Sequence, residues 1–244
     1  MERAIGDPGE FLNNSVASRA VNIEPDMRLV RRYDIYHHRY RSLLQGWGSA
    51  GLALLALGIG LCWWQHPVWG GILIVLSLPV LFIASRLPQT LKGDAYRNGL
   101  LIPGIITNLN PLTLTCVADV RPGGEDDEEP GTIVWGVKEV IIKELPGQAA
   151  ELGMQAPCVS LFGDTDEEHR FYTNFEPRPL AWGTKEAGII EQARRVIDDE
   201  EWLLLPVLAR AYAAAEKNDE GIAYFDAELT PVSLPKAEAT EPAS

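Results

Sequence analysis

Two uncharged apolar stretches follow each other closely in the first third of the chain. Residues 46–64 and residues 68–85 contain no Asp, Glu, Lys or Arg, and only Gln65, His66 and Pro67 separate them. As helices with a rise of about 1.5 Å per residue, both stretches would span roughly the 30 Å hydrocarbon core of a bilayer. We therefore predict a transmembrane helical hairpin over residues 46–87, embedded in a lipid bilayer. A hairpin buried inside a soluble protein is the alternative.

Small and aromatic residues mark the predicted contacts of this hairpin. Ala56 and Gly60, four positions apart, would allow the two helices to approach closely. Tryptophans lie near the connection and at the far end of the first helix, as in the aromatic belts of membrane proteins. They are Trp63, Trp64, Trp69 and Trp47.

Basic residues flank the hairpin and are absent from its connection. Those before it are Arg28, Arg31, Arg32, Arg39 and Arg41, and those after it are Arg86, Lys92 and Arg97. Positive charge favours the cytoplasmic side of a membrane. We therefore expect a multi-pass protein of the inner (plasma) membrane with both termini in the cytoplasm.

The segment before the hairpin shows a helical period. Apolar and aromatic residues recur at steps of three and four, and Pro25 suits a first helical position. This face contains Met27, Val30, Tyr33, His37, Tyr40 and Leu44. Residues 25–45 are therefore predicted to form an amphipathic juxtamembrane helix, lying either on lipid headgroups or on the soluble domain. Residues 1–24 carry little periodicity and are predicted to be flexible.

Alternating apolar and polar residues predict short strands after the hairpin. Residues 102–107 and 112–120 flank a turn and are expected to pair as one hairpin, and residues 132–143 form a further strand. Residues 157–162 and 169–175 are expected to form another hairpin, with Phe162 opposite His169. Cys116 and Cys158 lie in these strands and are predicted to face the core.

Five or six short strands with Gly and Pro turns predict a small, mostly antiparallel β barrel-like domain or a curled sheet. Helices are expected to follow, with Thr184 as an N-cap and a break near Pro206. Residues 95–225 are thus predicted to form a cytoplasmic β-rich domain with C-terminal helices, and residues 226–244 a disordered tail. The fold class is α+β.

Two segments of this domain are distinctive: Asn98-Gly99-Leu100-Leu101-Ile102-Pro103-Gly104, and the run from Phe175 to Thr184. They resemble a family of actinobacterial, notably corynebacterial, membrane proteins. Members of that family carry a domain of unknown function after transmembrane helices, and the likeness covers roughly residues 95–200. The resemblance implies an actinobacterial envelope setting and transfers no catalytic residue.

Charge excludes one class of partner. The net charge is −13, and from Ala95 onward there are 12 Lys and Arg against 27 Asp and Glu. Phosphates repel such a domain, so nucleic acid is excluded as a partner, and anionic lipid is disfavoured as a surface. A protein partner with a basic surface is the expected alternative.

Two features are candidates for partner binding. One is an acidic run, Glu125, Asp126, Asp127, Glu128 and Glu129. It either binds a partner or is an ordinary solvated loop. The other is Trp182, which either stacks on a ligand or partner or fills the junction between sheet and helix.

No catalytic, metal or cofactor site is predicted. Asp164, Asp166 and Glu168 resemble the start of a calcium loop, but His169 occupies the position of the required glycine. In the expected hairpin, Cys158 lies on the order of 13 Å from His169, too far for a nucleophile and its base.

Two functions remain. The first is a non-catalytic membrane-anchored adaptor or regulatory protein whose acidic domain binds a protein, with envelope biogenesis as the setting. The second is a small membrane-associated enzyme or lipid-intermediate-binding protein that uses a pocket in the β domain.

Overall fold

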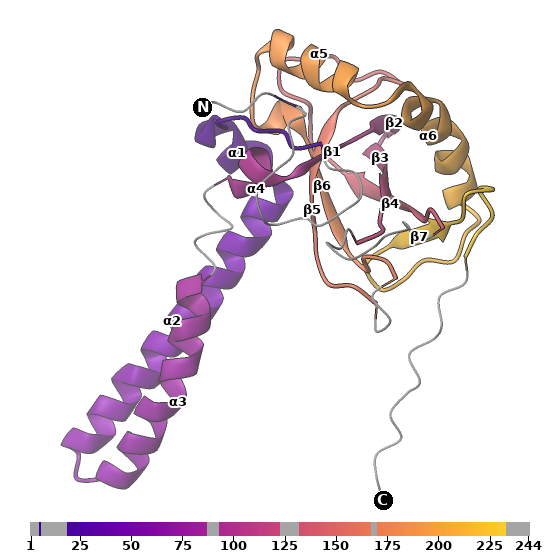
Figure 1. Ribbon diagram of the computed structural model, residues 1–244. Helices are drawn as coiled ribbons and strands as arrows, with labels where there is room; N and C mark the ends of the chain where they lie inside the picture. Colours follow the sequence, from indigo (N-terminus) through magenta and orange to yellow (C-terminus); the bar gives the residue numbers. More distant parts are fainter. Residues whose placement is uncertain (1–4, 6–18, 87–92, 123–131, 167–169, 233–244) are drawn as a thin grey trace, which may run out of the picture. The chain divides into compact units, whose positions relative to one another are not determined.

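The computed structural model describes residues 5, 19–86, 93–122, 132–166 and 170–232. The chain divides into two compact units, residues 25–94 and residues 1–24 together with 95–244. The first unit is helical and the second contains the β-sheets (Figure 1). Mixed helix and sheet are therefore confirmed.

The helical unit consists of α1 (Met27–Tyr33), α2 (Ile35–Trp63) and α3 (Pro67–Arg86). A single helix over residues 25–45 is wrong, because the helix breaks at Asp34 and α2 then continues directly into the apolar stretch. The Asp34 carboxylate accepts the N–H groups of Tyr36 (2.9 Å) and His37 (3.1 Å). An extended Asp with these contacts is an N-cap, which starts a new helix inside an otherwise continuous apolar period.

Helices α2 and α3 pack against each other along small residues that recur every seven positions. A Cβ added at Gly58 would lie 2.8 Å from Gly70 O, and one added at Gly51 would lie 2.7 Å from Leu81 Cδ2. Along α3, the small residues Ser77 and Ala84 continue the spacing of Gly70 and are buried. Seven residues make almost two helical turns, so these positions share one face.

The predicted contact through Ala56 and Gly60 is wrong. Ala56 is exposed, and a Cβ added at Gly60 would meet nothing within 4 Å. Both positions are rotated away from the face that carries Gly58.

The outward surface of this helix pair is apolar. Large exposed side chains include Leu52, Leu57, Trp63, Trp64, Trp69, Val75, Leu78 and Phe82. Among the described residues one helix, α2, is long and apolar enough to cross a membrane, while the apolar part of α3, Pro67–Phe82, is shorter. Only 11% of the apolar window of α2 is buried, which argues against the core helix of a soluble protein.

The second unit contains two separate antiparallel sheets. Its elements are α4 (Asp94–Asn98), β1 (Leu100–Ile102), β2 (Gly104–Leu109), β3 (Leu112–Asp119), β4 (Trp135–Ile141), β5 (Cys158–Phe162), β6 (Phe175–Pro179), the 3₁₀ helix η2 (Leu180–Trp182), α5 (Ala187–Val196), α6 (Asp199–Tyr212) and β7 (Ile222–Phe225). One sheet has the order β1-β5-β6 and the other β2-β3-β4-β7.

The barrel-like expectation is therefore wrong for the described residues, which form no closed barrel. The reason lies at Pro103, the single residue between β1 and β2. The chain passes from one sheet to the other at this point, although sequence alternation alone does not distinguish one long strand from two strands in different sheets.

The sheet β2-β3-β4-β7 is covered on both faces, which explains the almost continuous burial of β3. On one face, Cys116 Sγ lies 3.6 Å from Cys158 Sγ of the other sheet. On the opposite face, Thr115 is directed towards Glu139 and the groove beside α6. Figure 1 shows α6 beside this sheet.

The predicted pairing of the β5 hairpin is also wrong. Phe162 pairs with Phe175 and Cys158 with Pro179, so the second strand starts six residues later than the expected 169–175. In the described part of the chain between these strands, the Asp166 carboxylate accepts the N–H groups of Arg170 and Phe171. Residues whose apolar and polar alternation resembles that of a strand therefore form a local loop instead.

The ends of the second unit are more ordered than expected. Leu101 N donates to Arg19 O (2.7 Å), so part of the predicted flexible N-terminus lies beside β1. Residues 222–225 form β7, which the sequence pattern did not reveal, and Val232 N donates to Tyr224 O (2.8 Å). The helix break occurs at residues 197–198 instead of at Pro206, which lies inside α6. Residues 233–244 of the predicted tail lie outside the described residues.

Candidate functional site

An open groove of about 570 Å³ lies between the β2-β3-β4 strands and α6. Hydroxyl, amide, charged and small apolar side chains share its surface. The lining residues are Ile105, Thr107, Asn108, Thr113, Glu139, Pro206, Ala209 and Arg210. The volume falls within the range of about 300–1,000 Å³ that is usual for small-molecule sites.

A row of hydrogen bonds crosses the strands beneath this groove. Thr115, which is fully buried, places its Oγ1 2.8 Å from Thr107 Oγ1 and 3.2 Å from Glu139 Oε1. A carboxylate accepts, so Thr115 donates to Glu139 and Thr107 donates to Thr115. This row fixes one oxygen of Glu139. The other oxygen has no hydrogen-bond partner among the described residues.

Arg210 reaches the groove from the last turn of α6. Its Nε donates to Pro206 O (3.2 Å), and within the described part of the chain its terminal nitrogens have no partner. No ion pair joins Arg210 to Glu139 among these residues. The groove therefore holds one positive and one negative group that do not neutralise each other.

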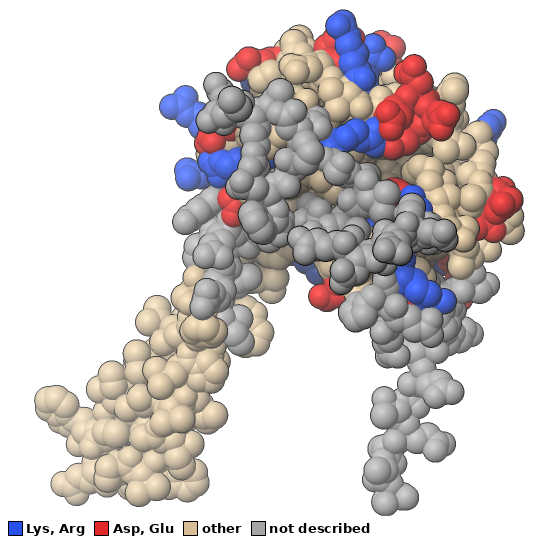
Figure 2. Space-filling model, viewed as in Figure 1, with Lys and Arg blue, Asp and Glu red and all other residues tan. Residues whose placement is uncertain are grey.

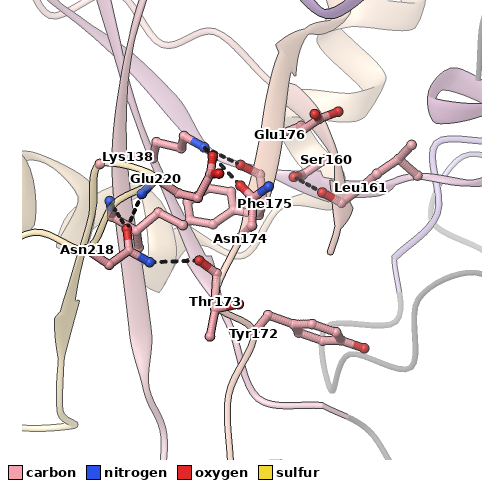
Figure 3. A network of polar contacts seen from close by, with 12 residues as sticks. Lys138, Ser160, Leu161, Tyr172, Thr173, Asn174, Phe175, Glu176, Asn218 and Glu220 are labelled. Atoms are coloured by element: carbon pink, nitrogen blue, oxygen red, sulfur yellow. Dashed lines mark hydrogen bonds and ion pairs between the residues drawn. The ribbon is translucent and has the colours of Figure 1, made fainter. Parts of the chain in front are cut away.

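A second polar network lies on the other face of β4 (Figure 3). Lys138 is almost fully buried, and its Nζ donates to Asn174 Oδ1 (3.0 Å) and Phe175 O (3.0 Å), with Glu220 Oε2 at 4.0 Å. Asn218 donates to Thr173 O (2.8 Å) and Tyr224 Oη (3.0 Å). Its Oδ1 accepts two backbone N–H groups from the start of β7 and the turn before it.

These contacts use the ammonium group of Lys138 to join β4, the residues before β6 and the turn before β7. A buried cation with such partners is stabilising only as long as they remain. Because these acceptors of Lys138 belong to the protein itself, this network holds the strands together.

Cys116 and Cys158 face the core, as the alternation predicted, and neither is exposed. Burial raises the pKa of the Cys158 thiol, and the neighbouring Cys116 adds to this effect. A protonated, inaccessible thiol is a poor nucleophile. His169, which was rejected above as a base for Cys158, lies outside the described residues.

Acidic side chains are exposed at the start of α6. Asp198, Asp199 and Glu200 are exposed, and Arg19 pairs with both Asp198 and Glu201. Burial raises the pKa of Glu201, and Arg19 opposes this shift. Figure 2 shows acidic and basic side chains on the unit that contains the β-sheets, and uncharged side chains over the apolar part of the α2–α3 pair.

The two predicted partner-binding features have different outcomes. Glu125, Asp126, Asp127, Glu128 and Glu129 lie outside the described residues. Trp182 is fully buried, and its Nε1 donates to Glu144 O (3.1 Å). A partner or ligand therefore has no access to Trp182, which fills the junction between β6 and the helices.

Sequence reasoning missed the groove. Thr107, Thr115, Glu139 and Arg210 are distant in the chain, and a single polar residue in a strand usually faces solvent. The sequence contained one indication of a polar surface at this place. Thr113 and Thr115 occupy one side of a strand whose other side is wholly apolar.

The two segments that resemble a known family are packing positions. A Cβ at Gly99 would lie 2.3 Å from Ala95 O, and one at Gly183 would lie 2.5 Å from Tyr96 Cδ1. Gly104 is equally constrained, with Cys158 Sγ at 2.8 Å. These glycines allow the chain to pass close to α4 and β5, so the two segments serve packing and identify no reactive group.

Comparison with known proteins agrees with that resemblance. Residues 91–211 match the family described as protein of unknown function, DUF3239. A crystal structure described as that of a "putative membrane protein" from Corynebacterium diphtheriae aligns with 50% of this chain and 97% of its own, at 20% identity and a TM-score of 0.43. No curated protein shows significant sequence similarity to the chain.

Proposed function

Because residues 91–211 carry a DUF3239 domain and follow an apolar helix pair, we propose that the protein is a membrane-anchored adaptor. Its acidic domain binds a protein partner that has a basic surface, and the protein performs no catalysis. The observation that carries the proposal is the contrast between two uncharged apolar helical stretches, residues 46–64 and 68–85, and a following domain with a large excess of acid.

The anchor is supported by the surface of α2 and α3. Their large apolar side chains point outwards, and exposed apolar area of this extent is costly in water. Lipid removes that cost. In this proposal both helices cross the membrane, and the basic residues on either side of the pair keep both termini in the cytoplasm.

The adaptor role is supported by the charge of the domain. An excess of acid on one domain creates a field that speeds association with a basic surface and repels anionic lipid. Asp199 and Glu200 are part of that field and are exposed. They also favour the start of α6, where negative charge meets the positive end of the helix dipole.

We predict that a fluorescent reporter fused to the C-terminus is active and that alkaline phosphatase fused at the same place is inactive. The fluorescent protein folds in the cytoplasm, whereas the phosphatase needs an oxidising compartment for its disulfides. Reporter activities in cells at equal expression give the answer. Active phosphatase without fluorescence would show that only one helix crosses the membrane or that the orientation is reversed.

We predict that association with the partner slows with salt. The partner is first captured by crosslinking in native membranes and identified, and association rates are then measured at several salt concentrations. The Debye length falls from about 10 Å at 0.1 M to about 3 Å at 1 M, so a steered rate drops strongly over this range. Asp199→Asn with Glu200→Gln, and Ser/Gly replacement of residues 125–129, should each lower the rate and flatten its salt dependence.

Lys185→Gln is the control, because it removes an exposed positive charge from the same domain and should raise the rate. Melting temperatures check that the α6 substitutions leave the fold intact. If neither salt nor any of the three variants changes the association rate, the acidic charge of the domain serves only its solubility.

A further inference from the structure

We propose that the groove beside α6 binds a small amino-acid-like zwitterion, whose ammonium group pairs with Glu139 and whose carboxylate pairs with Arg210. The inference rests on the groove alone and does not depend on the adaptor role. It assigns a ligand class to the cavity that the strands β2, β3 and β4 form with α6.

The first argument is charge complementarity. Glu139 and Arg210 line the same groove, and no ion pair joins them among the described residues. A ligand with one charge pairs with either Glu139 or Arg210. Its apolar part then lies beside the residue that is left unpaired. A zwitterion satisfies both sides at once. A guanidinium group binds a carboxylate through two parallel hydrogen bonds, and the terminal nitrogens of Arg210 are available for them.

The second argument is the fixed position of Glu139. Thr115 is fully buried and donates to Glu139 Oε1, and Thr107 donates to Thr115 in turn. This row holds one carboxylate oxygen and leaves the other for a ligand. A group that is already oriented loses less entropy when the ligand binds.

The third argument is the support of Arg210. Leu205, Leu208 and Tyr212 of α6 are buried, while Pro206, Ala209 and Arg210 lie in the groove. Positions three and four residues apart share a helix face, so packing of the first set presents the second set to the strands. The base of the Arg210 side chain thus belongs to a fixed helix.

The fourth argument is the apolar part of the groove lining. Ile105, Pro206 and Ala209 supply apolar contacts for the methylene groups that separate the ligand's ammonium and carboxylate. Thr113 and Asn108 lie at the rim, and their side chains bond to the β2–β3 turn at Pro111 O (3.0 Å) and Asn110 N (3.0 Å). The rim is therefore held by its own hydrogen bonds.

An ordinary surface also contains single charges, so the alternative is that both groups are merely solvated. A basic residue in the last turn of a helix is favourable without any ligand. The two interpretations differ in whether a ligand binds through Glu139 and Arg210 together. If the charges are only solvated, no ligand will require both of them together.

The test uses the full chain in detergent micelles and a series of ω-amino acids: glycine, β-alanine, 4-aminobutanoate and 6-aminohexanoate. Butylamine and butyrate supply each charge alone. Calorimetry or chemical-shift titration should show one chain length binding best, at millimolar dissociation constants, and more tightly than either singly charged compound. Glu139→Gln and Arg210→Gln should each weaken that binding about five- to tenfold.

Three further variants sharpen the result. Thr115→Val removes the donor that orients Glu139, so it should weaken binding in the parent and have no further effect in Glu139→Gln. Glu228→Gln and Lys185→Gln change exposed charges outside the groove lining and should leave the affinity unchanged. Melting curves of every variant exclude unfolding as the cause.

Three outcomes would overturn the proposal. One is a series in which no amino acid binds more tightly than butylamine or butyrate. Another is binding that Glu139→Gln and Arg210→Gln leave unchanged. The third is binding of phosphoethanolamine without binding of any amino acid, which would assign the Arg210 side to phosphate.

Discussion

Gly70→Leu is expected to prevent α2 and α3 from packing against each other. A Cβ at this position would lie 2.4 Å from Cys62 Sγ, 2.5 Å from Gly58 O and 2.8 Å from Cys62 N. Two of these atoms belong to the backbone of α2, which cannot rotate away as a side chain can. Overpacking in a well-filled core costs about 1–3 kcal/mol, and a backbone collision of this kind should lie at or above the upper end.

Gly71→Leu is a matched control on the same helix, because a Cβ at Gly71 meets nothing within 4 Å. The two variants add the same side chain next to each other and differ only in the face that carries it. Thermal loss of helix in detergent, followed by circular dichroism, and hydrogen exchange along α2 and α3 measure the effect. If Gly70→Leu unfolds like Gly71→Leu, the glycine contact is not what holds the helices together.

The existence of this helix pair could be predicted, but its contact face could not. Apolar length and a three-residue connection are local features, and they require neighbouring antiparallel helices. The rotation of each helix about its own axis depends on the partner. The pair Ala56 and Gly60 fits a common spacing, yet the real contacts place Gly58 against Gly70 and Gly51 against Leu81. A spacing of seven between small residues was visible in both helices.

Strand positions were easier to predict than strand partners. The alternation around Cys116 indicated a strand and its inward face, and the structure confirms both. The division into two sheets depends on the interruption at Pro103 between β1 and β2, and the β5–β6 register depends on the Asp166 loop. Both are set by contacts that alternation does not encode, because a shift in register preserves the pattern while changing every partner.

The groove was beyond sequence reasoning for the same reason. Thr115, Glu139 and Arg210 come from two strands and a distant helix, and each alone resembles an ordinary polar residue. Trp182 shows the opposite difficulty, since a tryptophan beside prolines suits a binding surface and a packing position equally well. Burial separates these possibilities, and burial is a tertiary property.

Trp182→Ala should cost about 3–5 kcal/mol of unfolding free energy, because a large side chain with no exposed surface leaves a cavity when it is truncated. The loss also leaves Glu144 O without the indole N–H that lies 3.1 Å away. Because Glu144 is exposed, water can partly replace this donor, and loss of the hydrogen bond adds about 1 kcal/mol. Trp182→Phe keeps most of the apolar volume and removes only this donor, so its cost should be clearly smaller.

Denaturant unfolding of the full chain in detergent, followed by tryptophan fluorescence and circular dichroism, compares the parent with Trp182→Ala and Trp182→Phe. The expected order of stability is parent, then Phe, then Ala. Ligand or partner binding of the Phe variant should match the parent below the unfolding transition, because the indole faces the interior. Parent-like unfolding of Trp182→Ala with a loss of binding would reverse the assignment, since only an accessible side chain can affect binding without affecting the core.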